Sequence, residues 1–428
     1  MGTPDTDTRP IAPTQLVVGL YVWLDMKWMD HPFLTNRFLI KTEQDIAILR
    51  SLSLSGKLHY LPGKSLAEPL PPGGAPAAHD TLDDEQTRAA EALALEQQRL
   101  AMARREKIRQ VKDAAARADR AWESAASATR EALSTLSRSP RMAGKHLAQL
   151  SRETAASIAQ GPNVLLHLLG TKEDQGPQFH ALNVMTLCML VGKKAGLTQN
   201  ELSDLALAAL AHDAGKSQIP LPILKNGHRK KHEEDHYRLH VKHSVQLAQE
   251  SGAFNGRAIA MIGEHHEAVD GSGWPKGRSE LSPGSRILAM TNRYDRLCAP
   301  ESPDITPLMP SEALARMLRQ EGSRHDPQLL AILITLLGVY PPGTVVRLND
   351  GSLALVVSPG VDIHRPRILL YSPDLPDTEA PMLDLGKEPD LEVVDAIRPA
   401  DLPVEVLQWL NPQKRLACFF SVEDTPLR

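Results

Sequence analysis

The residues best suited to chemistry are a histidine–aspartate pair and a second, histidine-rich string further along the chain. His212 and Asp213 end an apolar run that begins at Ala208, and the string HHEAVDGSGWP occupies His265–Pro275. Two adjacent imidazoles followed by an acid and a glycine-rich turn form an uncommon combination. Imidazole and carboxylate groups together suit iron, manganese or zinc in a hydrolytic site. These residues therefore predict a metal-dependent hydrolytic centre.

The histidines are unevenly distributed. Nine of the sixteen lie between His180 and His266, which needs a cause because a buried imidazole without a partner reduces stability. We interpret at least three of the four in the charged segment 227–243 as solvated: His228, His232, His236 and His243. An isolated histidine such as His146 or His167 is interpreted as a core residue with a satisfied partner. The candidate metal ligands are then His180, His212, Asp213, His240, His265 and His266.

The order of these motifs resembles a known family. The run from about Phe179 to Asp295 resembles an HD-GYP domain, the metal-dependent phosphodiesterase branch of the HD superfamily that opens cyclic di-GMP. The matching segments are LALAALAHDAGKSQIP, HVKHSVQLA, HHEAVDGSGWP in place of the family's HHExxDGxGYP, and LSPGSRILAMTNRYDRL, with His180 ahead of them. The resemblance implies an HD-type helical bundle whose helices converge on one interior site.

The resemblance also implies a ligand set and roles for single residues. It implies two divalent transition-metal ions, iron or manganese, bridged by Asp213. One ion would be held by His180, His212, Asp213 and Asn292, and the other by Asp213, His240, His265 and His266. Asp213 and Lys216 are the expected catalytic residues. Lys216 would also bind the scissile phosphate, and Gly271 and Gly273 would let the backbone approach the substrate.

Three departures from the family pattern bear on activity. Trp274 stands where tyrosine is usual, which is a mild change if the ring only packs. Asn292 stands at the last acidic ligand and offers a neutral oxygen. In place of a basic run that contacts substrate phosphates, the chain reads CAPESPDITP, where Glu301 and Asp304 would repel a phosphate.

Two functional interpretations follow from these departures. One is an active phosphodiesterase that hydrolyses cyclic di-GMP to pGpG or GMP. The other is a catalytically impaired HD-GYP-like domain that acts as a signalling or protein-interaction module. Hydrolysis of a different nucleotide is a third option, which the HHExxDGSG string disfavours because it is typical of the HD-GYP branch.

Composition limits the compartment and the partners. The chain of 428 residues is long enough for two or three domains, and its net charge of −4 does not favour a nucleic-acid partner. Its three cysteines are far apart, which disfavours a disulfide framework. The start of the sequence does not resemble a signal peptide, and no apolar run reaches the length of a membrane span. We therefore expect a soluble cytoplasmic protein without a membrane or nucleic-acid partner.

The expected organisation is a multidomain, mainly α-helical chain with small β-rich parts at both ends. The predicted order is a disordered tail (1–13), a β-rich module (14–62), a Pro/Gly linker (63–80), a long helix (81–136), an HD-GYP-like metal phosphohydrolase domain (140–340) and a β appendage (341–428). The β-rich module resembles the small domain of unknown function often found ahead of HD-GYP domains, and we expect it to sense a signal or dock a protein partner. The long helix is either a solvated helix or a coiled coil that forms a homodimer.

Periodicity and turn residues predict individual elements. Gln15–Leu24 is expected to form a strand pair or one bent strand, and Met142–Leu169 one or two helices broken at Gly161 and Pro162. Helices are also expected at Gln199–Asp213 and Ser285–Arg296. The Asn-Asp-Gly sequence that ends at Gly351 predicts a hairpin in the C-terminal part.

Overall fold

The structure is a computed structural model, and it describes residues 8–26, 31, 33, 37–52, 54, 56–71, 123–160, 163–167, 176–373, 382–410 and 417–421. Of residues 156–160, 163–167 and 417–421 only the backbone is described. The chain divides into two compact units, one of residues 1–114 with 372–381 and one of residues 115–371 with 382–428.

The first unit is a four-stranded antiparallel sheet accompanied by one short helix. The strands lie in the order β1-β4-β2-β3. Their bounds are β1 Arg9–Pro10, β2 Tyr21–Leu24, β3 Arg37–Leu39 and β4 Leu58–Tyr60, with α1 at Glu43–Ser51. Thr42 and Asp45 cap α1 reciprocally, because the Thr42 hydroxyl accepts from the Asp45 amide and the Asp45 carboxylate accepts from the Thr42 amide. This small sheet closes over its own core, which includes Leu20, Val22 and Leu49.

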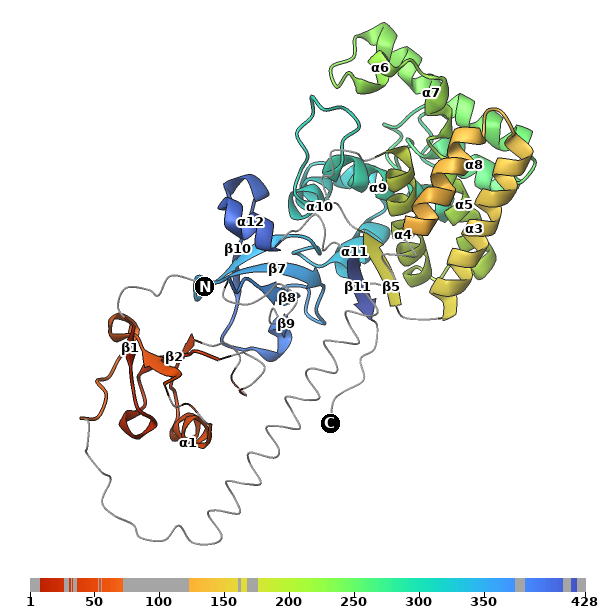
Figure 1. Cartoon of the computed structure of the whole chain (residues 1–428). Coiled ribbons are helices and arrows are strands. Elements are labelled where there is room, and N and C mark those ends of the chain that lie inside the picture. The colour runs from red at the N-terminus through yellow and green to blue at the C-terminus, as the bar shows by residue number, and fades with distance from the viewer. Residues whose placement is uncertain are drawn as a thin grey trace. The chain divides into compact units, whose positions relative to one another are not determined.

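The second unit contains a helical bundle, which Figure 1 shows from α3 to α11. Its helices are 123–135, α3 Pro140–Gln160, α4 Pro177–Lys194, α5 Gln199–Ala211, η4 Ala214–Gln218, α6 Leu221–Lys225, α7 Lys231–Ser251, α8 Gly256–Glu264, α9 Pro283–Cys298, α10 Pro310–Arg319, η5 Gly322–Arg324 and α11 Pro327–Leu337. Helix α4 packs against α5 and α9, and α3 packs against α5 and α7. Every residue from His180 to Gly192 is buried, so α4 is the central helix, as expected for a helix that is largely apolar all round.

Local signals at the helix ends place the histidine motifs. Helix α5 begins with a reciprocal cap between Thr198 and Glu201, and His212 is its C-cap residue. Helix α8 ends in the same way, with His265 at its C-cap. After α5 the chain turns tightly against α7, where a Cβ on Gly215 would lie 2.2 Å from the carbonyl oxygen of His240. The two motifs therefore lie at helix ends that face α7.

Two predicted elements were wrong. Residues 163–167 form strand β5 (Asn163–His167) rather than a second helix, and β5 pairs with β11 (Ala417–Ser421). A strand partner 250 residues away leaves no local signal, so periodicity alone could not identify it. In the first unit, Gln15–Leu24 is a strand only from Tyr21, because a 3₁₀ turn at Pro13–Gln15 and Gly19, with φ of 95°, precede it.

The C-terminal part of the second unit is a five-stranded antiparallel sheet. Its strand order is β10-β6-β7-β8-β9. The bounds are β6 Val345–Leu348, β7 Leu353–Ser358, β8 Arg367–Leu370, β9 Met382–Asp384 and β10 Val393–Ile397, with helix α12 at Val404–Leu410. The predicted hairpin joins β6 to β7 through Gly351, with φ of 85°.

The remaining expectations concern the tail, the linker and the long helix. Residues 1–7 and 72–122 lie outside the described residues, so most of the predicted disordered tail, part of the linker and most of the predicted long helix are not covered. Among the residues that the structure does describe, no helix combines the length and the apolar character needed to cross a bilayer.

Candidate metal centre

Five imidazoles from four parts of the bundle converge on one carboxylate. His180 comes from α4, His212 from the end of α5, His240 from α7, and His265 and His266 from the end of α8. The Nε2 atoms of His180 and His212 lie 3.0 Å apart, and the Nε2 of His240 lies 3.4 Å from that of His265 and 3.2 Å from that of His266. The six residues predicted from the histidine-rich motifs therefore meet in one place.

Backbone carbonyls fix the orientation of three of these rings. The Nδ1 atoms of His212, His240 and His265 lie 2.7 Å from the carbonyl oxygens of Ala209, Tyr237 and Ile262. Each carbonyl belongs to the residue three positions earlier and accepts the Nδ1 proton, so each Nε2 presents a lone pair to the centre. This is the tautomer that metal ligation through Nε2 requires.

Asp213 lies between two groups of these imidazoles. Its Oδ1 is 3.4 Å from the Nε2 of His240 and 3.7 Å from that of His265. Its Oδ2 is 3.3 Å from the Nε2 of His180 and 3.4 Å from that of His212. We call Asp213 Oδ1 with His240, His265 and His266 the α7–α8 half-site, and Asp213 Oδ2 with His180 and His212 the α4–α5 half-site. Within each half-site the donor atoms all lie within 4.8 Å of one another.

The donors of the α7–α8 half-site fit a divalent cation. Asp213 Oδ1 is buried and has no hydrogen-bond partner, which is costly unless a cation approaches it. Burial lowers the pKa of His240 and His266 well below the usual 6.5. It also lowers the pKa of His212, in the other half-site, to about 4. These rings are therefore neutral at pH 7, with lone pairs available to a metal.

The α4–α5 half-site carries additional charged partners. Asp213 Oδ2 forms an ion pair with Lys216 Nζ at 2.9 Å and accepts a hydrogen bond from a terminal nitrogen of Arg296 at 2.5 Å. Burial alone would raise the pKa of Asp213, but Lys216, His212 and Arg296 hold it well below its usual 3.8. Asp213 is therefore a carboxylate, and two cationic side chains already neutralise one of its oxygens.

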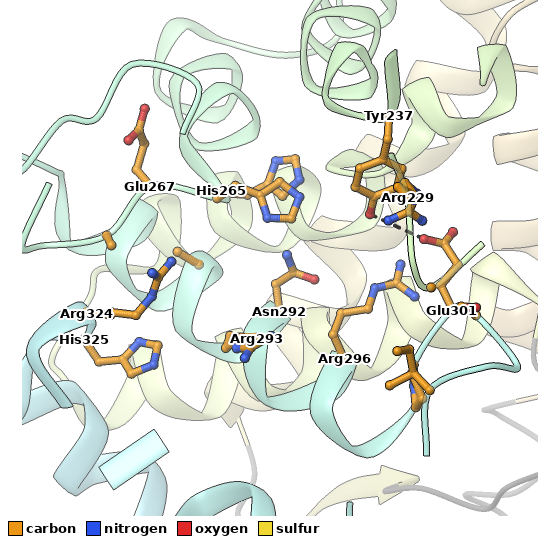
Figure 2. Close-up of a pocket in the computed structure, with 17 residues that line it drawn as sticks. Arg229, Tyr237, His265, Glu267, Asn292, Arg293, Arg296, Glu301, Arg324 and His325 are labelled. Atoms are coloured by element: carbon orange, nitrogen blue, oxygen red, sulfur yellow. Dashed lines mark hydrogen bonds between the residues drawn. The ribbon is translucent and has the colours of Figure 1, made fainter. Parts of the chain in front are cut away.

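Two residues of α9 border this half-site. The Asp295 carboxylate lies 2.6 Å from His180 Nδ1 and accepts a hydrogen bond from Asn183, so it orients the His180 ring. Asn292 is 3% exposed, and its Oδ1 is buried without a hydrogen-bond partner. Figure 2 shows the Asn292 amide directed toward the histidines, where the last ligand was expected. Its role as a ligand remains a prediction.

A cleft of about 290 Å³ opens beside the histidines, as Figure 2 shows. His265, His266 and Asn292 line it. Four arginines also line it: Arg229, Arg293, Arg296 and Arg324. Three of them form ion pairs with a carboxylate, whereas Arg324 donates a hydrogen bond to the Ser272 hydroxyl. The cleft thus offers guanidinium groups for an anionic ligand.

The acidic residue Glu301 lies in this cleft but does not stand alone. Its carboxylate lies 2.8 Å from Lys216 Nζ, which offsets the repulsion of phosphate expected from the sequence. Asp304 accepts hydrogen bonds from the Ser302 hydroxyl in its own loop and from the Gly227 amide between α6 and α7. Lys216 is buried between Asp213 and Glu301 and is not among the lining residues, so its contact with a substrate phosphate remains a prediction.

The loop after α8 is held together by close backbone contacts. A Cβ on Gly273 would lie 2.4 Å from the Ala268 nitrogen, and Gly271 has φ of 76°. Neither glycine lines the cleft, so the structure places both in the closure of the loop, and their contact with substrate remains a prediction. The Trp274 ring stacks on His266 with centroids 4.0 Å apart, so the ring at this position packs against a candidate ligand.

Sequence reasoning did not assign site roles to three neighbouring residues, Tyr237, Asp295 and Arg324, and it considered Arg296 only as a possible contact for a substrate phosphate, not as a partner of Asp213. Asp295 and Arg296 lie three and four residues after Asn292, so they share its face of α9. This spacing was the sequence signal that could have placed them at the site. Arg324 had no such signal, because η5 reaches the cleft only through tertiary packing.

Two domain families match this chain. Residues 136–329 match the HD domain family, and residues 8–146 match a domain of unknown function, DUF3391. A cyclic di-GMP phosphodiesterase of Pseudomonas aeruginosa is 26% identical over 418 residues, which cover 92% of each chain. A response regulator of Xanthomonas campestris, named a cyclic di-GMP phosphodiesterase, is 33% identical over 153 residues, 34% of this chain and 39% of that protein.

Further similarities are partial or distant. A 3'3'-cGAMP-specific phosphodiesterase of Vibrio cholerae is 30% identical over 165 residues, 38% of this chain and 35% of that protein. A solved structure of an HDG"Y"P protein from Bdellovibrio bacteriovorus aligns with a TM-score of 0.43 and 17% identity, over 76% of this chain and 97% of that one.

Proposed function

We propose that this chain, an HD-domain protein with a DUF3391 domain ahead of its bundle, is a metal-dependent phosphodiesterase that hydrolyses cyclic di-GMP. The convergence of five imidazoles on Asp213, beside an arginine-lined cleft, carries the proposal. The Pseudomonas relative, which is similar along nearly the whole chain and bears the name of this activity, supports the choice of substrate.

The α7–α8 half-site would hold a divalent ion through three imidazoles and Asp213 Oδ1. When bound, such an ion would polarise a phosphoryl oxygen and make water a stronger nucleophile at neutral pH. The chain's own contribution is orientation. Backbone carbonyls hold His240 and His265 with Nε2 inward, and Trp274 holds the His266 ring in place.

The cleft would bind the substrate through its phosphates. Cyclic di-GMP carries two phosphodiesters, so one can lie at the histidines while the other is held some distance away. Arg324 lies across the cleft from Arg296 in Figure 2, with Asn292 between them. Arg324 would bind the second phosphate and take over part of the role of the basic run that this sequence lacks. Arg296 would donate to an oxygen of the scissile phosphate.

The test is turnover by the purified full chain loaded with manganese. We expect cyclic di-GMP to be converted to pGpG or GMP, and we expect Asp213→Asn to abolish turnover. Parallel reactions with 3'3'-cGAMP determine the base preference, and cleavage of that compound alone would reassign the substrate. If the folded, metal-loaded chain cleaves neither compound, the proposal fails and the chain is an impaired signalling module instead.

A further inference from the structure

The two oxygens of Asp213 have different surroundings. Oδ1 faces His240 and His265 and receives no hydrogen bond from the protein. Oδ2 faces His180 and His212 but also forms an ion pair with Lys216 and receives a hydrogen bond from Arg296. The α7–α8 half-site therefore offers a free carboxylate oxygen, whereas the carboxylate oxygen of the α4–α5 half-site is already bound by two cations.

The donors of the α4–α5 half-site also provide little negative charge. They are two imidazoles, Oδ2 of Asp213 and, as predicted from the sequence, the neutral amide of Asn292. Asn292 and Arg296 are four residues apart on α9, so their side chains share one face of the helix. That face brings a neutral amide and a guanidinium toward Asp213 Oδ2, where a cation site calls for a negative group. The α9 carboxylate at this half-site, Asp295, is already engaged by His180 Nδ1 and Asn183. A divalent ion placed there would be repelled by Arg296 at short range in a poorly solvated site.

We propose that Arg296 takes the place of the second metal ion, so that the centre holds one divalent ion, in the α7–α8 half-site. This inference rests on the proposed metal centre. An arginine suits the position because its guanidinium remains protonated at all working pH values and cannot lose its charge to make room for an ion. Its side chain is 21% exposed and lines the cleft, so N–H groups remain available to a phosphoryl oxygen.

In this arrangement the metal ion and Arg296 have different roles. The ion in the α7–α8 half-site would supply the Lewis acid, and Arg296 would supply fixed positive charge without activating water. Lys216 forms ion pairs with both Asp213 and Glu301, because its Nζ lies 2.9 Å from the first carboxylate and 2.8 Å from the second. Asp213 keeps its position between imidazoles and cations without a second ion.

The experiment counts metal ions in the full chain. Each variant is loaded with manganese and desalted, and the metal per chain is measured by inductively coupled plasma mass spectrometry. We expect about one ion in the wild type and in Asn292→Asp, and about two in the double variant R296A/N292D. The matched control is R293A/N292D, which removes the same charge from the same helix. Arg293 binds Glu321 rather than Asp213, so we expect about one ion there.

A second variant and a second measurement guard against misfolding. R296M/N292D keeps an unbranched side chain at this half-buried position, and it should gain the same second ion if R296A/N292D does not fold. Electron paramagnetic resonance of the manganese forms should change from an isolated-ion spectrum to an exchange-coupled one only where Arg296 has been removed.

Each contrary outcome has a distinct meaning. Two ions in the wild type or in Asn292→Asp would overturn the inference and leave the proposed function intact. One ion in folded variants that lack Arg296 would also overturn it. No bound ion in any variant would overturn both the inference and the metal centre on which the proposed function rests.

Discussion

At the scale of single residues, the cleft arginines differ in how much of their charge is already neutralised. Arg293 binds Glu321, Arg229 lies 3.7 Å from Glu234, and Arg296 binds Asp213. Arg324 is anchored to the Ser272 hydroxyl instead, and its backbone carbonyl accepts from the Val269 amide. Its charge helps to lower the pKa of the nearby Asp270, but among the described residues it forms no ion pair with a carboxylate, which makes Arg324 the most informative arginine to change.

We expect Arg324→Gln to raise KM for cyclic di-GMP about tenfold with little change in kcat, because a charge-assisted hydrogen bond to a non-reacting phosphate contributes to binding before and during the reaction. Steady-state kinetics on the manganese-loaded chain measures both constants. Arg278→Gln is the control, since Arg278 is exposed and does not line the cleft. An unchanged KM, or an equal effect in the control, would show that Arg324 does not bind the substrate.

Glu321 makes a pH-dependent contribution to stability. Burial would raise its pKa, but hydrogen bonds from Arg293 and Arg316, with His325 close by, hold it well below the usual 4.5. Because the folded-state pKa is the lower one, this stabilisation is complete above the unfolded-state value and is lost as the pH falls through the folded-state value. Its partners Arg293 and Arg316 are partly exposed, so we expect a contribution of only about 1 kcal/mol.

Glu321→Gln tests this expectation. Urea unfolding of the wild type and the variant should differ most above about pH 5, and the difference should shrink as the pH falls toward about 2. The exposed Glu280, changed to Gln, should show little difference at any pH. A difference that is constant with pH would exclude the assigned charge interaction.

At the scale of elements, the site depends on where helices end. The His212–Asp213 pair and the His265–His266 pair follow the last residues of α5 and α8, and the helix caps set both ends. These signals are local, which is why the candidate ligands could be predicted from the sequence. The contact of Arg296 with Asp213 could not, because it depends on how α9 crosses the bundle, and that angle is set by the packing of residues far apart in sequence.

The loop after α8 provides a prediction about backbone packing. We expect Gly273→Ala to destabilise the second unit by about 1–3 kcal/mol, because its Cβ would lie 2.4 Å from backbone atoms of Glu267 and Ala268. Thermal unfolding measures the loss, and Trp274 fluorescence should report the disturbed stack on His266. Gly256→Ala is the control, since nothing lies within 4 Å of its added Cβ at the start of α8. Equal melting temperatures would show that the loop adjusts freely.

At the scale of the whole molecule, the chain combines two units with separate cores. Their general character could be predicted, because a β-rich start, a helical middle and an Asn-Asp-Gly hairpin each have local sequence signatures. The pairing of β5 with β11 could not, since it joins segments from opposite ends of the second unit. The predicted helical stalk and dimer involve residues 81–136, of which 81–122 lie outside the described part, and they remain predictions.

Division into two units predicts an asymmetric response to metal. An ion that binds only the folded second unit stabilises it by mass action, about 2.7 kcal/mol when the free ion is at a hundred times its dissociation constant. Manganese should therefore raise the melting temperature of the second unit, and a chelator should reverse the shift. The first unit contains none of the candidate ligands, so its transition should not move. Differential scanning calorimetry of the full chain separates the two transitions.

Asp213→Asn is the control for this response, because the variant keeps all five imidazoles and removes the negative charge that both half-sites share. Its second transition should become insensitive to manganese at the same concentration. A shift that persists in Asp213→Asn would mean that the ion binds elsewhere, for instance to the solvated histidines of α7. A shift of both transitions by the same amount would point to nonspecific binding. Only a shift confined to the second unit and dependent on Asp213 ties the stability of the bundle to an ion at the converging imidazoles.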